Sequence, residues 1–225
     1  MMAEARLIFM FRLRVRFSRG EELKFISHLD IIRLWLRAMR RAGIPLEYTE
    51  GFSPHARISL AVPLSVGVTA DNELMDISIT KVISPHWFVD TMNRQLPDGL
   101  KVLEAAPIGP NVPSLQSQVR YTQYQVEIQT EKNEEEIKTV IDCLLVLESI
   151  PWHHERDTGR KSYDLRNLID DIWVVQMKPA AGVLGMILRC DESGSGRPEQ
   201  VALALGFPEY PLSIKRTKLL LGSHR

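Results

Sequence analysis

The sequence is poor in residues that form disulfides and metal centres. Its 225 residues include two cysteines, Cys143 and Cys190, which lie far apart in apolar patterns. There is no CxxC pair and no cluster of Cys with His, which excludes iron–sulfur and zinc sites of familiar spacing. We therefore expect two buried thiols in a reducing compartment, with no metal and no cofactor in this chain.

Long apolar runs and nucleotide-binding loops are also missing. The apolar stretch from Leu7 to Phe11 is too short for a signal peptide, and no run approaches the roughly 18–20 residues that cross a bilayer. The sequence contains no GxGxxG, no Walker loop and no HExxH, so the usual signals of dinucleotide, P-loop and metalloprotease chemistry are absent. We expect a cytoplasmic protein with no membrane partner.

The chain has no excess of charge of either sign. It holds 28 Lys and Arg against 28 Asp and Glu, so net charge alone indicates no partner. The distribution is uneven, since residues 1–60 contain 11 basic and 6 acidic side chains and residues 158–225 contain 10 and 7. A fold that brings the two ends together would present a local basic surface.

Hydrophobic periodicity predicts the same order of elements twice. In the first half we expect strands and helices at residues 11–17, 28–42, 58–68, 75–79, 85–96 and 100–106. Strand, helix, strand, strand, helix, strand is the order of a ferredoxin-like domain. In the second half we expect a similar series at residues 124–128, 134–145, 165–176, 183–189, 198–205 and 214–221.

A segment rich in Pro, Gly and Ser separates the two halves. Residues 107–117 include three prolines with little apolar periodicity, which is typical of a linker. The sequence therefore predicts an α+β protein of two tandem ferredoxin-like units, residues 1–106 and 119–225, joined by residues 107–118.

Residues 24–59 concentrate the groups that can bind an anion or move a proton. Ser27 and Asp30 match a capping box at the start of a helix. His28 lies in the first turn, where free N–H groups favour a neutral imidazole that can accept a proton. The alternative is that Ser27 and Asp30 serve only to cap the helix and that His28 has no functional role. The buried stripe of this helix is predicted to contain Leu29, Ile32, Trp35, Leu36 and Met39.

Four arginines follow the cap on another face of the same helix. They are Arg33, Arg37, Arg40 and Arg41, at positions i, i+4, i+7 and i+8. Arg binds phosphate through two parallel hydrogen bonds, so a phosphate backbone is a natural ligand. The alternative is a solvated helix face that pairs with acidic residues elsewhere.

The loop of residues 51–57 offers three further candidates. Phe52 would stack on a base, His55 would carry a proton and Arg57 would bind an anion. The alternative is a tight turn with Phe52 buried as a plug. His28 and His55 together are the minimum for a metal-independent ribonuclease that uses a paired acid and base.

Basic residues of the second half add weaker signals. Gly, Ser and Arg at residues 194–197 suit a phosphate nest at a helix start. The candidate RNA contacts in this half are Arg160, Lys161, Arg166, Arg197 and Arg216.

Several short motifs resemble one bacterial family. They are the segments FISHLD at 25–30, RAMRRAGIP at 37–45, GFSPH at 51–55, YDLR at 163–166, RP at 197–198 and IKRT at 214–217. Together they resemble the radical-SAM-linked domain of unknown function, and the likeness covers most of the chain. That family occurs as a separate chain beside a radical-SAM protein with a cobalamin-binding-type region, or is fused behind one. Its genes often lie near those of a ribonuclease E/G-type enzyme and large-subunit ribosomal proteins.

The resemblance implies a radical-SAM partner and an RNA or ribosome setting, and it supplies no catalytic residues. A more distant likeness of architecture connects the chain with CRISPR repeat-processing endoribonucleases. The Gly-rich loop expected near the C-terminus of those enzymes is reduced here to residues 194–196, which counts against cleavage.

Three functions follow from these observations. The leading hypothesis is an accessory, non-catalytic RNA-binding module in which Ser27, His28, Phe52 and the arginines contact the nucleotide. The second is a ribonuclease that uses His28 and His55. The third is an adaptor that binds the partner enzyme without nucleic acid.

Overall fold

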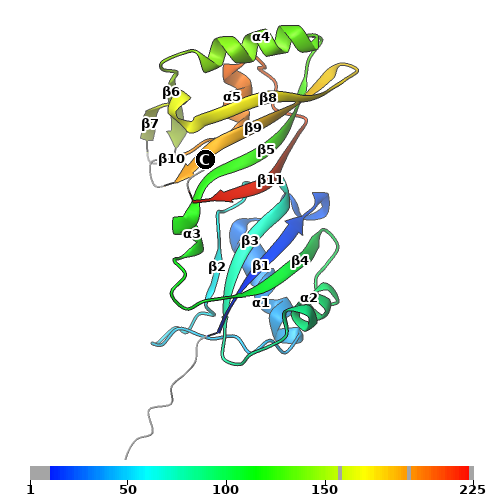
Figure 1. The fold of residues 1–225 in the computed structure, drawn as a ribbon, viewed down its shortest axis with the longest axis vertical. Coiled ribbons are helices and arrows are strands. Elements are labelled where there is room, and N and C mark those ends of the chain that lie inside the picture. The colour runs from blue at the N-terminus through cyan, green and yellow to red at the C-terminus, as the bar shows by residue number, and fades with distance from the viewer. Residues whose placement is uncertain (1–10, 157–158, 192–193, 223–225) are drawn as a thin grey trace, which may run out of the picture. The chain divides into compact units, whose positions relative to one another are not determined.

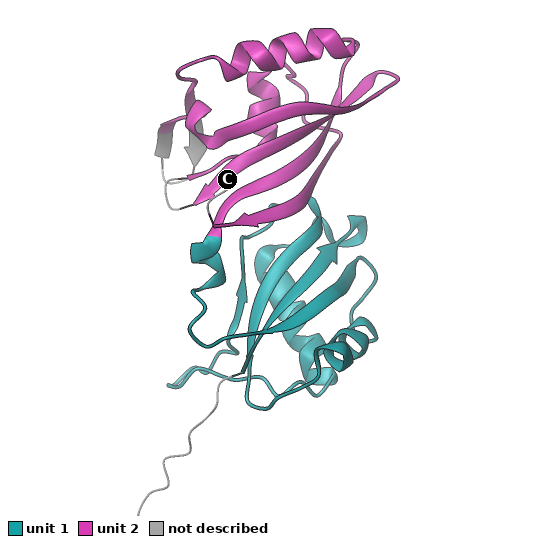
Figure 2. Ribbon diagram, in the orientation of Figure 1, with its two compact units in different colours: residues 1–118 teal, residues 119–225 magenta. Residues whose placement is uncertain are grey.

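The computed structural model describes residues 11–156, 159–191 and 194–222, with the side chains of residues 154–161 also left aside (Figure 1). The chain divides into two compact units, residues 1–118 and 119–225 (Figure 2). Each unit contains both strands and helices, and each is described by itself below.

The first unit has a four-stranded antiparallel sheet in the order β4-β1-β3-β2. Its elements are β1 (Phe11–Arg19), a 3-10 turn (Glu21–Leu23), α1 (His28–Arg41), β2 (Ile58–Leu60), β3 (Thr69–Ile79), α2 (Pro85–Asn93), β4 (Leu100–Ile108) and α3 (Leu115–Gln118). The order of elements confirms the first ferredoxin-like unit.

The second unit repeats this arrangement with the strand order β11-β5-β9-β8. Its elements are β5 (Val119–Gln129), α4 (Glu134–Leu145), β6 (Pro151–Arg156), β7 (Gly159–Asp164), a 3-10 turn (Arg166–Leu168), β8 (Ile169–Lys178), β9 (Ala181–Asp191), β10 (Gly194–Ser195), α5 (Pro198–Ala204) and β11 (Ser213–Leu221). The antiparallel pair of β6 and β7 is an insertion between α4 and β8, in a stretch whose sequence is mostly polar. The α+β class with two ferredoxin-like units is confirmed.

The core of the first unit lies between its sheet and its helices. Leu13, Val15 and Phe17 of β1 point inward, while the arginines that alternate with them lie on the other side. The ring of Phe17 meets that of Trp35 edge to face, with centroids 5.1 Å apart and planes at 72°. Each such buried apolar side chain stabilises the fold by about 1.5–3 kcal/mol relative to an exposed one.

The buried stripe of α1 differs from the predicted one. Ile31, Trp35, Ala38 and Met39 are buried, whereas Leu29 is 64% exposed. Trp35 and Met39 are confirmed from the predicted stripe, whereas Ile31 and Ala38 are buried in place of Leu29. Packing of Trp35 against the sheet decides the rotation.

The predicted strand at residues 58–68 is much shorter in the structure. β2 ends at Leu60, and the Ala61 N–H makes a further bond of 2.9 Å to the carbonyl of Leu74. Pro63 follows, and a residue without an N–H cannot continue the ladder. Beyond Leu60 the apolar residues belong to an irregular segment, in which Leu64 and Val68 are buried and Val66 is exposed.

The segment predicted as a linker is attached to the first unit. Arg12 Nη1 donates to the carbonyl oxygen of Val112 at 2.7 Å, and Gln116 Nε2 donates to that of Leu60 at 2.7 Å. The boundary between the units falls after Gln118.

The structure also bears on the expected burial of the two cysteines and on the expected absence of a membrane span. Cys190 is buried, but Cys143 is exposed on α4, so the expectation of two buried thiols is half right. No helix in the described ranges is long and apolar enough to span a bilayer.

Candidate functional site

Helix α1 begins at a side-chain cap. Ser27 Oγ accepts a hydrogen bond from the Asp30 N–H at 3.2 Å and donates to Asp30 Oδ2 at 2.7 Å. The N-cap prediction is confirmed, but the return bond of a full capping box is replaced by this side-chain pair. Helix α4 has the full box, with Asn133 and Glu136 bonded in both directions.

A buried arginine holds the segment that leads into α1. Arg19, at the end of β1, is 3% exposed. Its Nη2 donates to the carbonyl oxygens of Leu23 at 2.6 Å, Lys24 at 3.2 Å and Ile26 at 2.6 Å, and its Nε also donates to Leu23 at 2.9 Å. The guanidinium therefore fixes where the helix starts.

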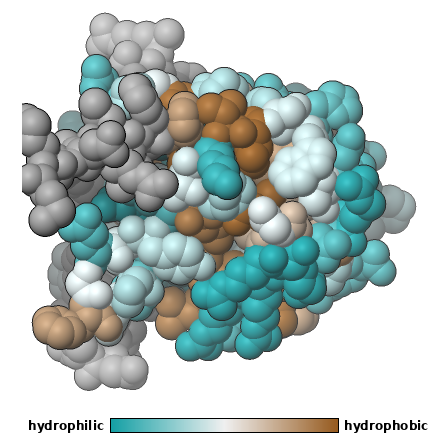
Figure 3. All heavy atoms as spheres, turned by 90° about the horizontal axis from the view of Figure 1, so that it is seen from below, coloured by the Kyte–Doolittle hydropathy of each residue, from teal (hydrophilic) through white to brown (hydrophobic). Residues whose placement is uncertain are grey.

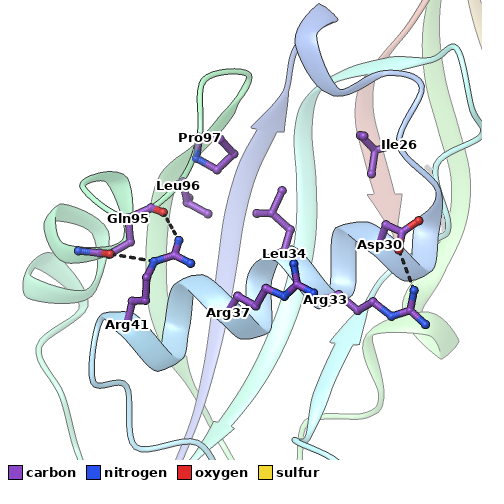
Figure 4. Close-up of a pocket in the computed structure, with 9 residues that line it drawn as sticks. All are labelled: Ile26, Asp30, Arg33, Leu34, Arg37, Arg41, Gln95, Leu96 and Pro97. Atoms are coloured by element: carbon purple, nitrogen blue, oxygen red, sulfur yellow. Dashed lines mark hydrogen bonds and ion pairs between the residues drawn. The ribbon is translucent and has the colours of Figure 1, made fainter.

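A groove of about 680 Å³ runs along α1, facing the turn between α2 and β4 (Figure 4). The turn contributes Gln95, Leu96 and Pro97 to its lining. The helix and the segment before it contribute Ile26, Asp30, Arg33, Leu34, Arg37 and Arg41.

Three of the predicted arginines line the groove one turn apart, and they differ in their contacts. Arg33 Nη1 bonds Asp30 Oδ1 at 2.8 Å. Arg41 Nη2 donates to the carbonyl of Gln95 at 2.7 Å, and its Nε donates to Gln95 Oε1 at 3.2 Å. Arg37, between them, is exposed and makes no hydrogen bond or ion pair with any described residue. Among the residues that the structure describes, none occupies its guanidinium, which can therefore bind an anion.

Asp30 is the acidic residue in this lining. The hydroxyl of Ser27, followed by Arg33, holds the pKa of the Asp30 carboxyl below its ordinary value of 3.8, and the charge of Arg37 acts in the same direction. Asp30 is therefore ionised at neutral pH. Three guanidinium groups against one carboxylate leave the groove with an excess of positive charge.

Arg40, the fourth predicted arginine, is exposed but is not among the nine residues that line the groove. The opposite wall of Gln95, Leu96 and Pro97 has no counterpart in the sequence prediction. These residues lie more than fifty positions after Arg41, and only the packing of α1 beside α2 and β4 brings them together.

The loop after α1 presents its aromatic residue to solvent. Tyr48 and Ala56 form an isolated bridge, and the Thr49 N–H bonds the His55 carbonyl at 2.8 Å, so the base of the loop is ordered like a hairpin. Phe52 near its tip is fully exposed. The alternative of a buried plug is therefore wrong, and the stacking role stays a prediction.

Arg57 and the two histidines complete the predicted residues of this unit. Arg57 Nε pairs with Glu47 Oε1 at 3.1 Å, which uses part of its charge within the loop. His28 is half-buried as the first residue of α1, and His55 is exposed in the loop. Neither histidine lines the groove, and their action as an acid–base pair stays a prediction.

The residues of the second unit that were predicted to contact RNA differ in burial and in hydrogen bonding. Arg166 donates to the carbonyl of Leu145 at 2.9 and 3.2 Å and to that of Ile169 at 2.8 Å. Its guanidinium therefore links the backbone at these two residues. Arg216 is 1% exposed. Arg197 is exposed at the N-cap of α5, where its side chain makes no cap bond. The side chains of Arg160 and Lys161 lie outside the described part of the chain.

Exposed apolar side chains lie just before and within the first turn of α1, and the sequence analysis missed them. Phe25 is 72% exposed, with the ammonium of Lys24 5.2 Å from its ring centroid, and Leu29 is also exposed. Seen from below, the molecule shows apolar residues gathered beside strongly hydrophilic ones (Figure 3).

In the described ranges, no group of three or more His, Cys, Asp or Glu side chains is placed to hold a metal ion.

The family of the chain follows from its sequence over both units. The model of a family described as "Uncharacterized protein conserved in bacteria (DUF2344)" matches residues 12–198. The chain belongs to the DUF2344 family. The match contains all of α1, the loop after it and the whole groove, so the candidate site lies in the part of the chain that defines DUF2344.

Solved structures share the fold of this DUF2344 chain. A chain in "Crystal Structure of a Cbf5-Nop10-Gar1 Complex" superposes with a TM-score of 0.51 and 10% identity, covering 93% of this chain and 48% of that one. An archaeal box H/ACA sRNP Nop10-Cbf5 complex gives a TM-score of 0.46 with the same identity and coverage, too low to carry an argument. The DUF2344 chain spans about half the length of these matches, and the likeness concerns fold alone. No curated protein matches the sequence.

Proposed function

We propose that this protein is an accessory RNA-binding module that acts with a radical-SAM partner in an RNA- or ribosome-related process. The observation that carries the proposal is the row of Arg33, Arg37 and Arg41 along one groove, with Arg37 unpaired in the described chain. The radical-SAM partner is inferred from the sequence motifs that resemble the radical-SAM-linked family.

The groove suits phosphate for electrostatic and geometric reasons. A guanidinium binds phosphate through charge-assisted, often paired hydrogen bonds. Arg41 is already oriented by Gln95, so less side-chain freedom is lost when a ligand binds.

Salt dependence and a matched pair of variants test the RNA-binding function. Fluorescence anisotropy with a labelled RNA should show affinity that falls steeply between 50 and 200 mM salt, by the counterion release that accompanies phosphate binding. Arg37→Ala should weaken binding and reduce the slope of log affinity against log salt by about 0.7 to 0.9. Arg40→Ala is the matched control, because it removes the same charge from the same helix outside the groove.

Binding that ignores salt, or that survives Arg37→Ala combined with Arg41→Ala, would contradict the proposal. The partner is tested separately. Co-purification from cells, with bound RNA sequenced and bound proteins identified, should recover a radical-SAM protein.

A protein-docking role is the second candidate, and the exposed Phe25 and Leu29 favour it. Large exposed apolar side chains are found at interaction surfaces. Phe25→Ser with Leu29→Ser should then release the partner while RNA affinity is unchanged. Retention of the partner by this double variant would contradict docking at this position.

A further inference from the structure

The groove along α1 has two walls of different character. Arg33, Arg37 and Arg41 project from the helix, and Leu34, Leu96 and Pro97 form an apolar surface beside them (Figure 4). We infer that this groove binds a short segment of single-stranded RNA, with phosphates on the arginine row and sugars and bases against the apolar wall. The inference rests on the proposed RNA-binding function and adds the form of RNA that is bound.

The spacing of the arginines matches a single strand. An α-helix rises 1.5 Å per residue, so successive arginines of the row are displaced by about 6 Å along the axis and the outer two by about 12 Å. That step is close to the separation of neighbouring phosphates along an extended strand. The row therefore offers one guanidinium to each of about three consecutive phosphates.

The apolar wall distinguishes a single strand from a duplex. In a duplex the bases are stacked inside and present mainly phosphate and sugar to a protein. Leu34, Leu96 and Pro97 would then face a charged backbone and gain little. Unstacked bases of a single strand can lie on these side chains and remove apolar surface from water.

The size of the groove agrees with a short segment. Its volume of about 680 Å³ lies within the range of sites that enclose small ligands, roughly 300–1,000 Å³. A space of this size suits a short segment of one strand.

The acceptor groups of the groove leave little capacity to read the donor groups of bases. The Asp30 carboxylate is bonded to Ser27 and Arg33, and both oxygens of Gln95 accept from Arg41. None of the nine lining residues is aromatic. Binding is therefore expected to tolerate many sequences, so one mixed-sequence probe suffices to test it.

The experiment compares two forms of one RNA on the full chain. A fluorescein-labelled 12-nucleotide RNA without self-complementarity and its 12-base-pair duplex are titrated at 50 mM salt and followed by anisotropy. The single strand should bind at least tenfold more tightly than the duplex. Arg37→Ala should weaken single-strand binding several-fold, and Arg40→Ala should leave it nearly unchanged.

Variants of the apolar wall test the placement of the bases. Leu34→Ser and Pro97→Ser should each weaken single-strand binding about three- to tenfold and leave duplex binding unchanged, in line with the loss of apolar contact. Val82→Ser, at an exposed apolar position outside the groove, is the control. Leu34 is half-buried, so if Leu34→Ser does not fold, exposed Pro97 decides the result alone.

The outcomes separate this inference from the function on which it rests. Duplex affinity equal to or above single-strand affinity, with the same loss in Arg37→Ala, overturns the single-strand inference and supports RNA binding. A single-strand preference that Pro97→Ser does not reduce overturns the placement of bases on the apolar wall. Failure of Arg37→Ala to affect either RNA overturns both proposals.

Discussion

Arg19 Nη2 donates to the carbonyl oxygen of Ile26 at 2.6 Å, so a buried guanidinium at the end of β1 fixes the residue that precedes the cap of α1. Burying a guanidinium is costly unless its N–H groups find acceptors. In the turn beside α1, Arg19 satisfies backbone carbonyls, including that of Leu23 at 2.6 Å. Because Ile26 lines the groove, the same contact positions one end of the candidate RNA site.

Arg19→Lys should lower the free energy of unfolding by about 2–3 kcal/mol, because an ammonium cannot reach several carbonyls in one plane and buried acceptors lose their donors. Urea denaturation followed by circular dichroism measures the change. Arg16→Lys is the matched control, since Arg16 lies on the same strand in an exposed pair with Glu104, and it should change stability by less than about 1 kcal/mol. Equal effects of the two variants would show that the carbonyl contacts of Arg19 are unimportant.

Asp30→Asn should raise RNA affinity about two- to fivefold, because it removes the acidic side chain that lines the groove and competes with phosphate for Arg33. The Asp30 N–H still bonds Ser27, so the cap of α1 persists. Anisotropy at low salt measures the gain, and Asp90→Asn on α2, outside the groove, should show none. A loss of affinity would mean that the carboxylate helps to bind the ligand.

Local signals in the sequence were sufficient for the order of the main helices and strands and for the helix caps. The cap at Ser27, the box of Asn133 with Glu136 and the start of α2 at Ser84 all depend on residues within one turn, so short patterns identify them. The alternation of β1 likewise separates its buried face from its arginine face. These features follow from propensities that act over three or four residues.

The groove itself required the tertiary structure. Arg41 and Gln95 are 54 positions apart, and no spacing in the sequence relates them. The rotation of α1 was also undetermined, because Leu29 and Ile31 are both apolar and only contact with the sheet selects Ile31 for the core. Sequence predicted that arginines would gather on α1, and packing decided which of them share a cavity with an apolar wall.

Asp164 should contribute stability that depends on pH. The Ile150 N–H, which donates to Oδ1 at 2.8 Å, is the main cause that lowers the pKa of this carboxyl below its ordinary value of 3.8. A carboxyl with a lowered pKa stabilises the folded state above the ordinary value, and that contribution is lost as the pH falls through the lowered pKa. Asp164→Asn should therefore reduce the melting temperature at pH 7, with a difference that shrinks below about pH 4.

Thermal melts of wild type and Asp164→Asn from pH 7 to pH 3 measure this difference. Asp170→Asn, an exposed carboxyl in the same unit, is the control and should show little change at any pH. A difference in melting temperature between wild type and Asp164→Asn that stays constant from pH 7 to pH 3 would contradict the electrostatic explanation. It would indicate that the variant loses only the steric fit of the aspartate.

Phe52→Ser should leave stability unchanged, because its fully exposed ring makes no contribution to the core. If the ring stacks on a base, the same variant should weaken RNA binding by about 1–3 kcal/mol, or roughly five- to 150-fold. Val82→Ser removes a largely exposed apolar side chain from another loop of the same unit and should have no effect. Melting temperature and anisotropy, measured on the same preparations, separate the two contributions. Unchanged RNA affinity in Phe52→Ser would exclude the stacking role of Phe52, and the exposed ring would then be available to contact the partner protein.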